Sequence, residues 1–237
     1  MLILFDIDLT LLSTGGSGAR AMLAAARQLF GPLFSTEGVS FAGRLDPLII
    51  SDLFARAAAV PTPASIADFT ARYQRCLADE LAGTTSCAAL PGALDLVAAL
   101  DLHRTHSPPL ALGILTGNFE TTGTMKLERC RIPLAPFEVR VWGDHSPNDP
   151  PHRSDLVPVA IRRYQSLRAA TLAPANVVVI GDTPHDVHAA LSHGCRALAV
   201  ATGRSSAAEL RDAGGHLVVP DLSDTPSILR WIFDRHP

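Results

Sequence analysis

The sequence has 237 residues, enough for one large domain or for a core domain that carries a smaller insertion. Hydrophobic residues make up 47% and charged residues 18%, which is typical of a folded globular protein and excludes a disordered chain. The formal net charge of -3 offers no basic face for a phosphate backbone, so we expect no nucleic-acid partner.

The four cysteines are far apart in the sequence and form no CxxC pair. This spacing argues against a disulfide framework or a zinc site and is compatible with a reducing cytoplasm. The apolar N-terminal stretch is short and carries two acids within ten residues, and no other stretch reaches membrane length without charge. We therefore expect a soluble, cytoplasmic protein with no membrane partner.

A short apolar run at residues 2–5 opens the chain and stops at Asp6, as a strand buried on both faces would. The next region, from about residue 16 to residue 85, contains helical patterns at residues 19–30, 47–58 and 66–82. It contains no convincing strand, so we expect an all-helical insertion directly after the first strand.

From residue 86 onward, apolar runs alternate with segments of helix length. We expect strands at residues 110–115, 139–142, 177–180, 197–201 and 217–219, and helices at residues 91–100, 122–131, 156–169 and 184–192. Such alternation predicts a parallel sheet that is covered by helices on both faces.

These patterns predict an α/β fold with a doubly wound, Rossmann-like parallel sheet. Residues 1–15 and 86–237 would form this core, and residues 16–85 would form a separate helical domain. An insertion after the first strand would lie over the carboxyl edge of the sheet, where open α/β folds bind their ligands.

Acidic side chains follow the first expected strand. Asp6 and Asp8 lie two residues apart in the segment DIDLT, and both could face one cleft as the chain turns. Two adjacent carboxylates repel each other unless a cation or a shared proton compensates, so this pair is a candidate metal or catalytic site.

Two further strand ends carry polar residues. The run ending at Leu115 is followed by Thr116, Gly117 and Asn118, and the run 177–180 is followed by GDTPHD, which contains Asp182 and Asp186. Carboxyl ends of parallel strands meet at one edge of a sheet, so we expect these groups to lie near the first acidic pair.

Together, DxDxT, a strand-terminal threonine and GDxxxD resemble the motifs of the haloacid dehalogenase-like hydrolase superfamily, and the resemblance covers essentially the whole chain. The helical insertion is similar to the family's cap domain in its first insertion site. One position departs from the pattern: Leu9 stands where the family usually has glycine, which removes backbone freedom at that turn.

The resemblance implies a Mg²⁺ site. Asp6, Asp182 and the backbone carbonyl of Asp8 would supply protein ligands, and Asp186 would either ligate the metal or hold its water shell. Mg²⁺ prefers oxygen ligands and would neutralise charge between a phosphate dianion and a carboxylate nucleophile.

The resemblance also implies the catalytic roles. Asp6 would attack phosphorus and form an aspartyl-phosphate, and Asp8 would protonate the leaving alkoxide and then activate water. Thr116 would donate hydrogen bonds to the transferring oxygens, while Gly117 and Asn118 would help to bind the substrate. An acid at the position of Asp8 favours phosphoryl transfer over dehalogenation, because a halide leaves without protonation.

The family places a basic residue between the strand-terminal threonine and GDxxxD, and two residues could fill this role. Lys126 lies on a segment with the mixed charges of a solvated helix face, whereas Arg153 lies in a loop that can reach the carboxyl edge of the sheet. We favour Arg153, because an arginine could fork across a carboxylate and a phosphoryl oxygen.

Arg44 and Asp46 resemble a cap loop that reaches toward substrate. For Asp46, a helix N-cap role with Pro47 at the first helical position fits equally well.

The sequence thus favours a Mg²⁺-dependent phosphatase that acts on a small phosphorylated metabolite, of the phosphoglycolate or sugar phosphate kind. A phosphomutase of the same superfamily is the alternative. A receiver-like signalling protein ranks lower because receivers are about half this length, and a non-catalytic phosphate-binding protein ranks lower because all five motif residues are intact.

Overall fold

Six parallel strands form the central sheet in the order β5-β4-β1-β6-β7-β8. The computed structural model describes residues 1–106 and 110–234. The strands are β1 (Leu2–Phe5), β4 (Ala111–Leu115), β5 (Phe137–Val141), β6 (Val177–Gly181), β7 (Arg196–Val200) and β8 (Leu217–Val219). The predicted parallel sheet is therefore confirmed, with strand ends that differ by at most two residues from the expected ones.

β1 lies in the middle of this sheet, hydrogen bonded to β4 on one side and to β6 on the other. All four of its residues are buried, as its continuous apolar sequence predicts. The chain order reverses on either side of β1, so the carboxyl end of β1 lies at the switch point where such sheets place their ligands.

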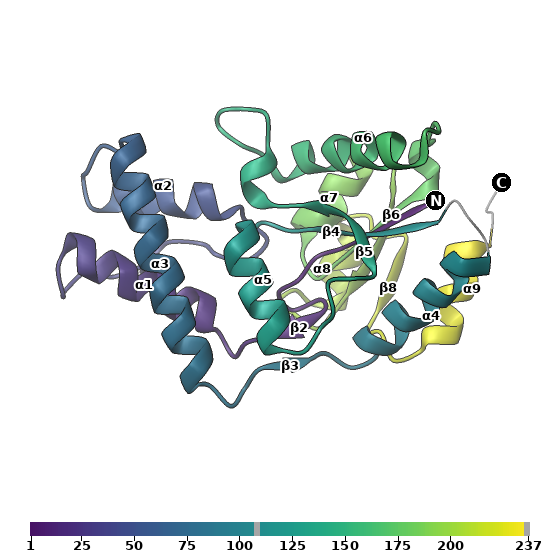
Figure 1. The fold of residues 1–237 in the computed structure, drawn as a ribbon, viewed down its shortest axis with the longest axis horizontal. Helices are drawn as coiled ribbons and strands as arrows, with labels where there is room; N and C mark the ends of the chain where they lie inside the picture. The colour runs from purple at the N-terminus through teal and green to yellow at the C-terminus, as the bar shows by residue number, and fades with distance from the viewer. Residues whose placement is uncertain (107–109, 235–237) are drawn as a thin grey trace.

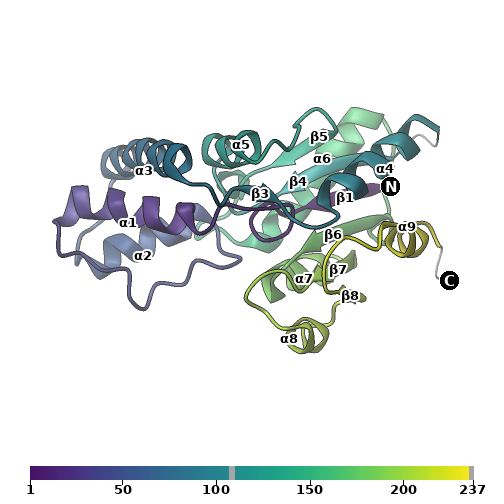
Figure 2. The same ribbon diagram turned by 90° about the horizontal axis from the view of Figure 1, so that it is seen from below.

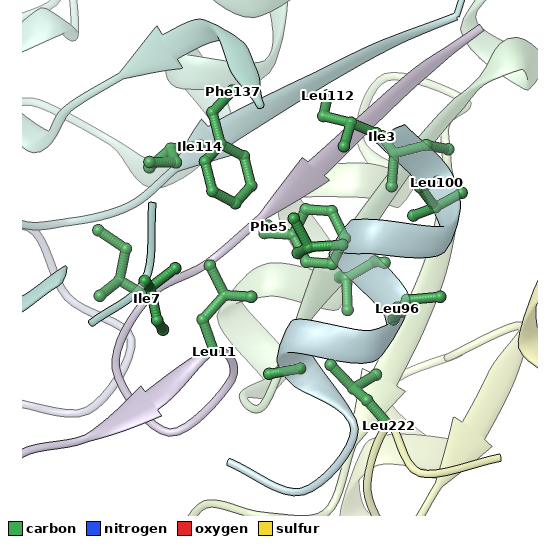
Figure 3. Close-up of a cluster of buried hydrophobic side chains, with 14 of the residues drawn as sticks. Ile3, Phe5, Ile7, Leu11, Leu96, Leu100, Leu112, Ile114, Phe137 and Leu222 are labelled. Atoms are coloured by element: carbon green, nitrogen blue, oxygen red, sulfur yellow. The ribbon is translucent and has the colours of Figure 1, made fainter. Parts of the chain in front are cut away.

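Helices cover both faces of the sheet (Figure 1). On one face lie α4 (Ala93–His106), α5 (Glu120–Arg129) and α9 (Thr225–Phe233), and on the other lie α6 (Leu156–Arg168), α7 (Pro184–Leu191) and α8 (Ala207–Asp212). Figure 3 shows the hydrophobic core between the sheet and the first group of helices. In this core the rings of Phe5 and Phe137 pack edge to face, with their centroids 5.9 Å apart. This double covering confirms the doubly wound, Rossmann-like fold.

Three helices form the insertion after β1: α1 (Ser17–Phe30), α2 (Asp46–Arg56) and α3 (Pro63–Gly83). They enclose a hydrophobic cluster of their own, built around Phe54, Phe69 and Tyr73. A capping box between Thr62 and Ser65 starts α3. Figures 1 and 2 show these helices beyond the carboxyl ends of the strands, where the sequence places them.

A two-stranded antiparallel ribbon joins the insertion to the sheet domain, formed by β2 (Leu12–Ser13) and β3 (Ala88–Ala89). Sequence analysis does not predict this ribbon, because two residues are too few to show a periodic pattern. It also misses α8 and α9, together with the short 3₁₀ turns η1 (Gly143–His145), η2 (Arg153–Asp155) and η3 (Pro174–Asn176).

Most helix limits lie within two residues of the expected ones, and two helices differ more. α4 begins two residues late, after Gly92 turns the chain with a φ of 75°, and ends six residues late, at His106, while α3 begins three residues early, at Pro63. None of the helices in the described part of the chain is long and apolar enough to cross a membrane.

Candidate active site

The turn after β1 presents Asp6 and Asp8 at the switch point. The backbone N–H of Asp6 still donates to Ile180 O at 2.9 Å, so the nucleophile candidate is held by the end of the sheet. Leu9 then adopts a φ of 57°, the left-handed conformation in which glycine is preferred. Leu9 thus takes a left-handed backbone conformation that disfavours residues with a Cβ, at a cost of about 1–2 kcal/mol.

Three carboxylates converge where β1 and β6 end. Oxygens of Asp6, Asp182 and Asp186 all lie within 4.8 Å of one another, and all three residues are at least 95% buried. Asp186 lies in the first turn of α7, where its Oδ2 accepts hydrogen bonds from the backbone and hydroxyl of Thr183. The loop after β7 closes the cluster, because a Cβ at Gly203 would lie only 1.8 Å from Asp182 Oδ2.

The electrostatics of this cluster favour a bound cation. Burial, together with Asp186 and Asp6, raises the pKa of Asp182 to about 8. Burial also raises the pKa of Asp6 to about 6, although the nearby Arg153 opposes the shift. Three buried oxygen donors that repel one another are the ligand set that a hard divalent cation such as Mg²⁺ prefers, so these residues fit such an ion.

Arg153 lies in η2, immediately before α6, and forms ion pairs with two members of the cluster. Its Nη2 lies 3.1 Å from Asp6 Oδ2 and also contacts Asp186 Oδ1. Burial acts to lower the pKa of the guanidinium, but the two carboxylates outweigh it and raise the pKa above its ordinary value. Its Nε is buried and has no hydrogen-bond partner among the described residues, so one donor is left to serve a ligand.

Lys126 does not lie on a solvated face, and this part of the sequence interpretation is wrong. Its side chain is 5% exposed, and its Nζ lies 2.6 Å from Asp8 Oδ2. α5 packs beside α3 (Figure 2), and Gly18 of α1 lies against the Lys126 ammonium, so this face of the helix is covered by the insertion instead of water. Burial acts to lower the pKa of Lys126, and Asp8 and Asp46 more than offset it, so that the pKa lies above its ordinary value.

The residues after β4 extend this polar network. Asn118 Nδ2 donates to Asp8 Oδ2 and to Thr116 Oγ1, in both cases at 2.9 Å. Thr116 itself is fully buried. Gly117 permits a close approach of the insertion, because a Cβ there would lie 2.1 Å from the carbonyl oxygen of Arg44.

Asp46 joins the insertion to the sheet domain instead of capping its own helix. The N-cap of α2 is Leu45, so the N-cap interpretation is wrong. Asp46 Oδ2 accepts hydrogen bonds from the backbone N–H of Phe119 at 3.1 Å and the hydroxyl of Thr122 at 3.4 Å. Burial raises the pKa of this carboxyl to about 7, against the influence of Lys126.

These groups surround one cavity of about 210 Å³ between the insertion and the carboxyl edge of the sheet. Asp6, Asp8, Thr116, Lys126 and Arg153 line it, and the insertion adds the side chain of Tyr73. Arg44 also lines it, although its guanidinium pairs with Asp52 of α2. The structure therefore brings together the sequence-predicted residues, and Asp186 joins them through its ion pair with Arg153.

Sequence reasoning missed three contributors to this site: Lys126 as a buried group, Tyr73 in the cavity wall, and Gly203 against Asp182. One signal could have identified the first, because Lys126 is the single lysine in a chain that contains 19 arginines. No local pattern distinguishes Tyr73 or Gly203, since their positions depend on how the insertion and the loop after β7 pack.

Comparisons with known proteins agree with this fold. A family model described as HAD-hydrolase-like matches residues 156–225. A hydrolase from Pseudomonas syringae shares the fold with a TM-score of 0.72 at 22% identity, covering 98% of this chain and 99% of its own. No curated protein matches the chain significantly in sequence.

Two further solved structures are similar over nearly their full length. A predicted phosphoglycolate phosphatase from Haemophilus somnus 129pt has a TM-score of 0.71 at 19% identity, covering 96% of this chain and 97% of its own. A predicted phosphatase from Clostridium acetobutylicum has a TM-score of 0.70 at 18% identity, covering 97% and 98%.

The fold and the site define the chain as an α/β protein with an acidic cluster at the switch point of a parallel sheet. In its C-terminal part, at residues 156–225, and in its fold, the chain is similar to haloacid dehalogenase-like hydrolases.

Proposed function

We propose that the protein is a Mg²⁺-dependent phosphatase that hydrolyses a small phosphate monoester through an aspartyl-phosphate on Asp6. The observation that carries the proposal is the position of Asp6, buried beside Asp182 and Asp186 and paired with Arg153 at 3.1 Å. A carboxylate so placed has a cation beside it and two further carboxylates with which it could hold a divalent ion, and positive charge is what an anionic nucleophile needs to approach a phosphate dianion.

Asp6, Asp182 and Asp186 would hold the Mg²⁺, with Asp8 contributing its backbone carbonyl. When bound, the ion neutralises negative charge on the phosphoryl group and on the nucleophile. Arg153 keeps the Asp6 carboxylate in place, and its unpartnered Nε is available to donate to a phosphoryl oxygen. Thr116 and the backbone around Gly117 and Asn118 would bind the remaining phosphoryl oxygens.

The reaction would proceed in two steps. An oxygen of Asp6 attacks phosphorus, the bond to the leaving oxygen breaks, and Asp8 gives its proton to that oxygen. Asp8 then takes a proton from water, which attacks the aspartyl-phosphate and releases inorganic phosphate with Asp6 restored.

The cavity volume of about 210 Å³ fits a small metabolite better than a polymer or a protein segment. The helical insertion, for which residues 16–85 remain the proposed boundaries of a cap domain, would close over the leaving group and exclude water. Two of the similar structures are described as phosphatases, which supports the same reaction type.

The test is release of inorganic phosphate from a panel of small phosphorylated metabolites, measured with Mg²⁺ and with excess chelator. We expect release that depends on the metal and is absent in Asp6→Asn. Full turnover in chelator, or transfer of the phosphoryl group between sugar positions without release, would contradict the proposal.

A further inference from the structure

Lys126 occupies a position that the proposed mechanism does not use. Its Nζ lies 2.6 Å from Asp8 Oδ2 and 2.6 Å from Asn118 Oδ1, and its side chain is almost fully buried. A buried ammonium carries a large desolvation cost, which its hydrogen bonds must offset. Because Arg153 already pairs with the nucleophile, this second cation serves a different carboxylate.

Both donors near Asp8 converge on one of its two oxygens. Oδ2 accepts from Lys126 Nζ and, at 2.9 Å, from Asn118 Nδ2. Asn118 is fixed in turn, because it donates to Thr116 and accepts from Lys126. In residues 1–106 and 110–234, no group hydrogen bonds to the other oxygen, Oδ1.

We infer that Lys126 is a positioning residue, which together with Asn118 clamps Oδ2 of Asp8 and leaves Oδ1 to exchange the proton with the leaving group and with water. The inference rests on the proposed phosphatase function, since it assigns the orientation of the acid–base residue of that reaction. Two hydrogen bonds to one oxygen fix the rotation of the carboxyl group, and misorientation of a catalytic group lowers its effectiveness steeply.

The surroundings of Lys126 explain why lysine stands here in a chain that otherwise uses arginine. A Cβ at Gly18 of α1 would lie 3.1 Å from Nζ and 3.7 Å from the hydroxyl of Tyr73, so the insertion closes tightly over the ammonium. A planar guanidinium is larger than an ammonium. It would need space that is occupied by the backbone of α1 at Gly18 and by the side chain of Tyr73. The insertion therefore contributes to the clamp through its shape.

The first test is Lys126→Met, with kcat/KM measured on an alkyl phosphate and on an aryl phosphate. Alkoxides need protonation to leave and aryloxides need it much less, so we expect the alkyl substrate to lose about tenfold or more beyond the aryl loss. Asp8→Asn should give the same signature, and the double variant should lose little more than Asp8→Asn alone, because the two residues act as a unit. Equal losses on both substrates, or additive losses, would overturn the inference.

A milder pair of variants guards against misfolding of Lys126→Met. Gly18→Ala presses on the ammonium, whereas Gly83→Ala, in another helix of the insertion, has no atom within 4 Å of the new methyl group. We expect Gly18→Ala alone to lower the alkyl rate selectively, with Gly83→Ala at the wild-type ratio. An unchanged ratio in Gly18→Ala, or equal changes in both variants, would contradict the clamp.

A readout that needs no turnover is available because the chain has one lysine. Protein labelled with ¹⁵N-lysine should give one Nζ ammonium signal by NMR, and Asp8→Asn and Gly18→Ala should shift it while Gly83→Ala should not. A signal insensitive to Asp8→Asn would overturn the inference.

The kinetic test also separates failure of the proposed function from failure of the inference. If the wild type hydrolyses neither phosphate, the proposed function fails and the inference fails with it. If the wild type hydrolyses both and Lys126→Met leaves the alkyl-to-aryl ratio unchanged, only the inference fails.

Discussion

Arg153 Nη2 lies 3.1 Å from Asp6 Oδ2, and the same nitrogen contacts Asp186, so one guanidinium joins the candidate nucleophile to the far acid of the GDxxxD motif. Sequence analysis favours Arg153 over Lys126 as the cation beside the nucleophile, and these contacts support that preference. Arg153 and Lys126 pair with different carboxylates of the site: Arg153 with Asp6 and Asp186, and Lys126 with Asp8.

Replacement of Arg153 by alanine should lower kcat by about a hundredfold or more, because it removes a positive group beside the transferring phosphoryl. Arg153→Lys should retain part of the activity, since it keeps the charge but loses the fork. The matched control is Arg162→Ala, an exposed position on α6, which should behave as wild type. Near-normal turnover in a folded Arg153→Ala protein would remove Arg153 from the mechanism.

Mg²⁺ should raise the melting temperature more at pH 8 than at pH 5. The pKa of Asp6 is raised to about 6 and that of Asp182 to about 8, so at pH 5 the ion must displace protons from its ligands. Differential scanning fluorimetry with and without Mg²⁺, at constant ionic strength, measures the shift. Asp182→Asn should abolish it, and a shift that is larger at pH 5 would contradict the assigned ligands.

Asp46 should make the stability of the protein depend on pH. Its pKa is raised to about 7 by burial, with Lys126 opposing the shift and Asp8 adding to it, and the phenol of Tyr73 is nearby. Such a group stabilises the fold below its unfolded pKa of about 4, and that contribution is lost as the pH rises through about 7.

The variant Asp46→Asn keeps the shape and the hydrogen-bond acceptor but does not titrate. Its melting temperature relative to wild type should therefore rise between pH 5 and pH 8. Asp68→Asn, on the surface of α3, is the control and should show the same difference at both pH values. A relative melting temperature for Asp46→Asn that falls with pH would show that Asp46 is buried as a stabilised anion.

Arg44→Ala should change the preference among metabolite substrates more than it changes hydrolysis of a small aryl phosphate. Arg44 lines the cavity from the insertion, so it can contact polar groups in the leaving group of a metabolite. A small aryl phosphate lacks such groups. Asp52→Ala is the matched control, because it breaks the pair with Arg44 and keeps the guanidinium. Proportional losses on all substrates would assign Arg44 a structural role.

The sheet and the acidic cluster could be predicted because both are encoded in short stretches of neighbouring residues. Buried parallel strands are continuous apolar runs, and Asp6 and Asp182 follow such runs directly, so topology alone brings them to one edge. The burial of Lys126 and the contacts of Asp46 could not be predicted in this way. Both depend on how the insertion packs against α5, which no spacing within α5 or α2 records.

The same reason applies to the backbone conformation of Leu9 and to the short ribbon of β2 and β3. The sequence shows that Leu9 stands where glycine is usual, but the left-handed backbone is imposed by the surrounding turn and is visible only in the structure. The strands β2 and β3 have two residues each, and their pairing depends on the two ends of the insertion meeting.

If Asp6 is the nucleophile, it becomes phosphorylated during turnover, and acid quenching detects this directly. Enzyme mixed with substrate and Mg²⁺ is quenched in acid, in which an acyl phosphate survives long enough for peptide mass spectrometry. We predict a phosphoryl group on the N-terminal peptide at Asp6, present in the wild type, absent in Asp6→Asn, and more abundant in Asp8→Asn on an aryl phosphate, because the second step is slowed. Phosphate release without any phosphoryl group on Asp6, or with one on a different residue, would contradict the account.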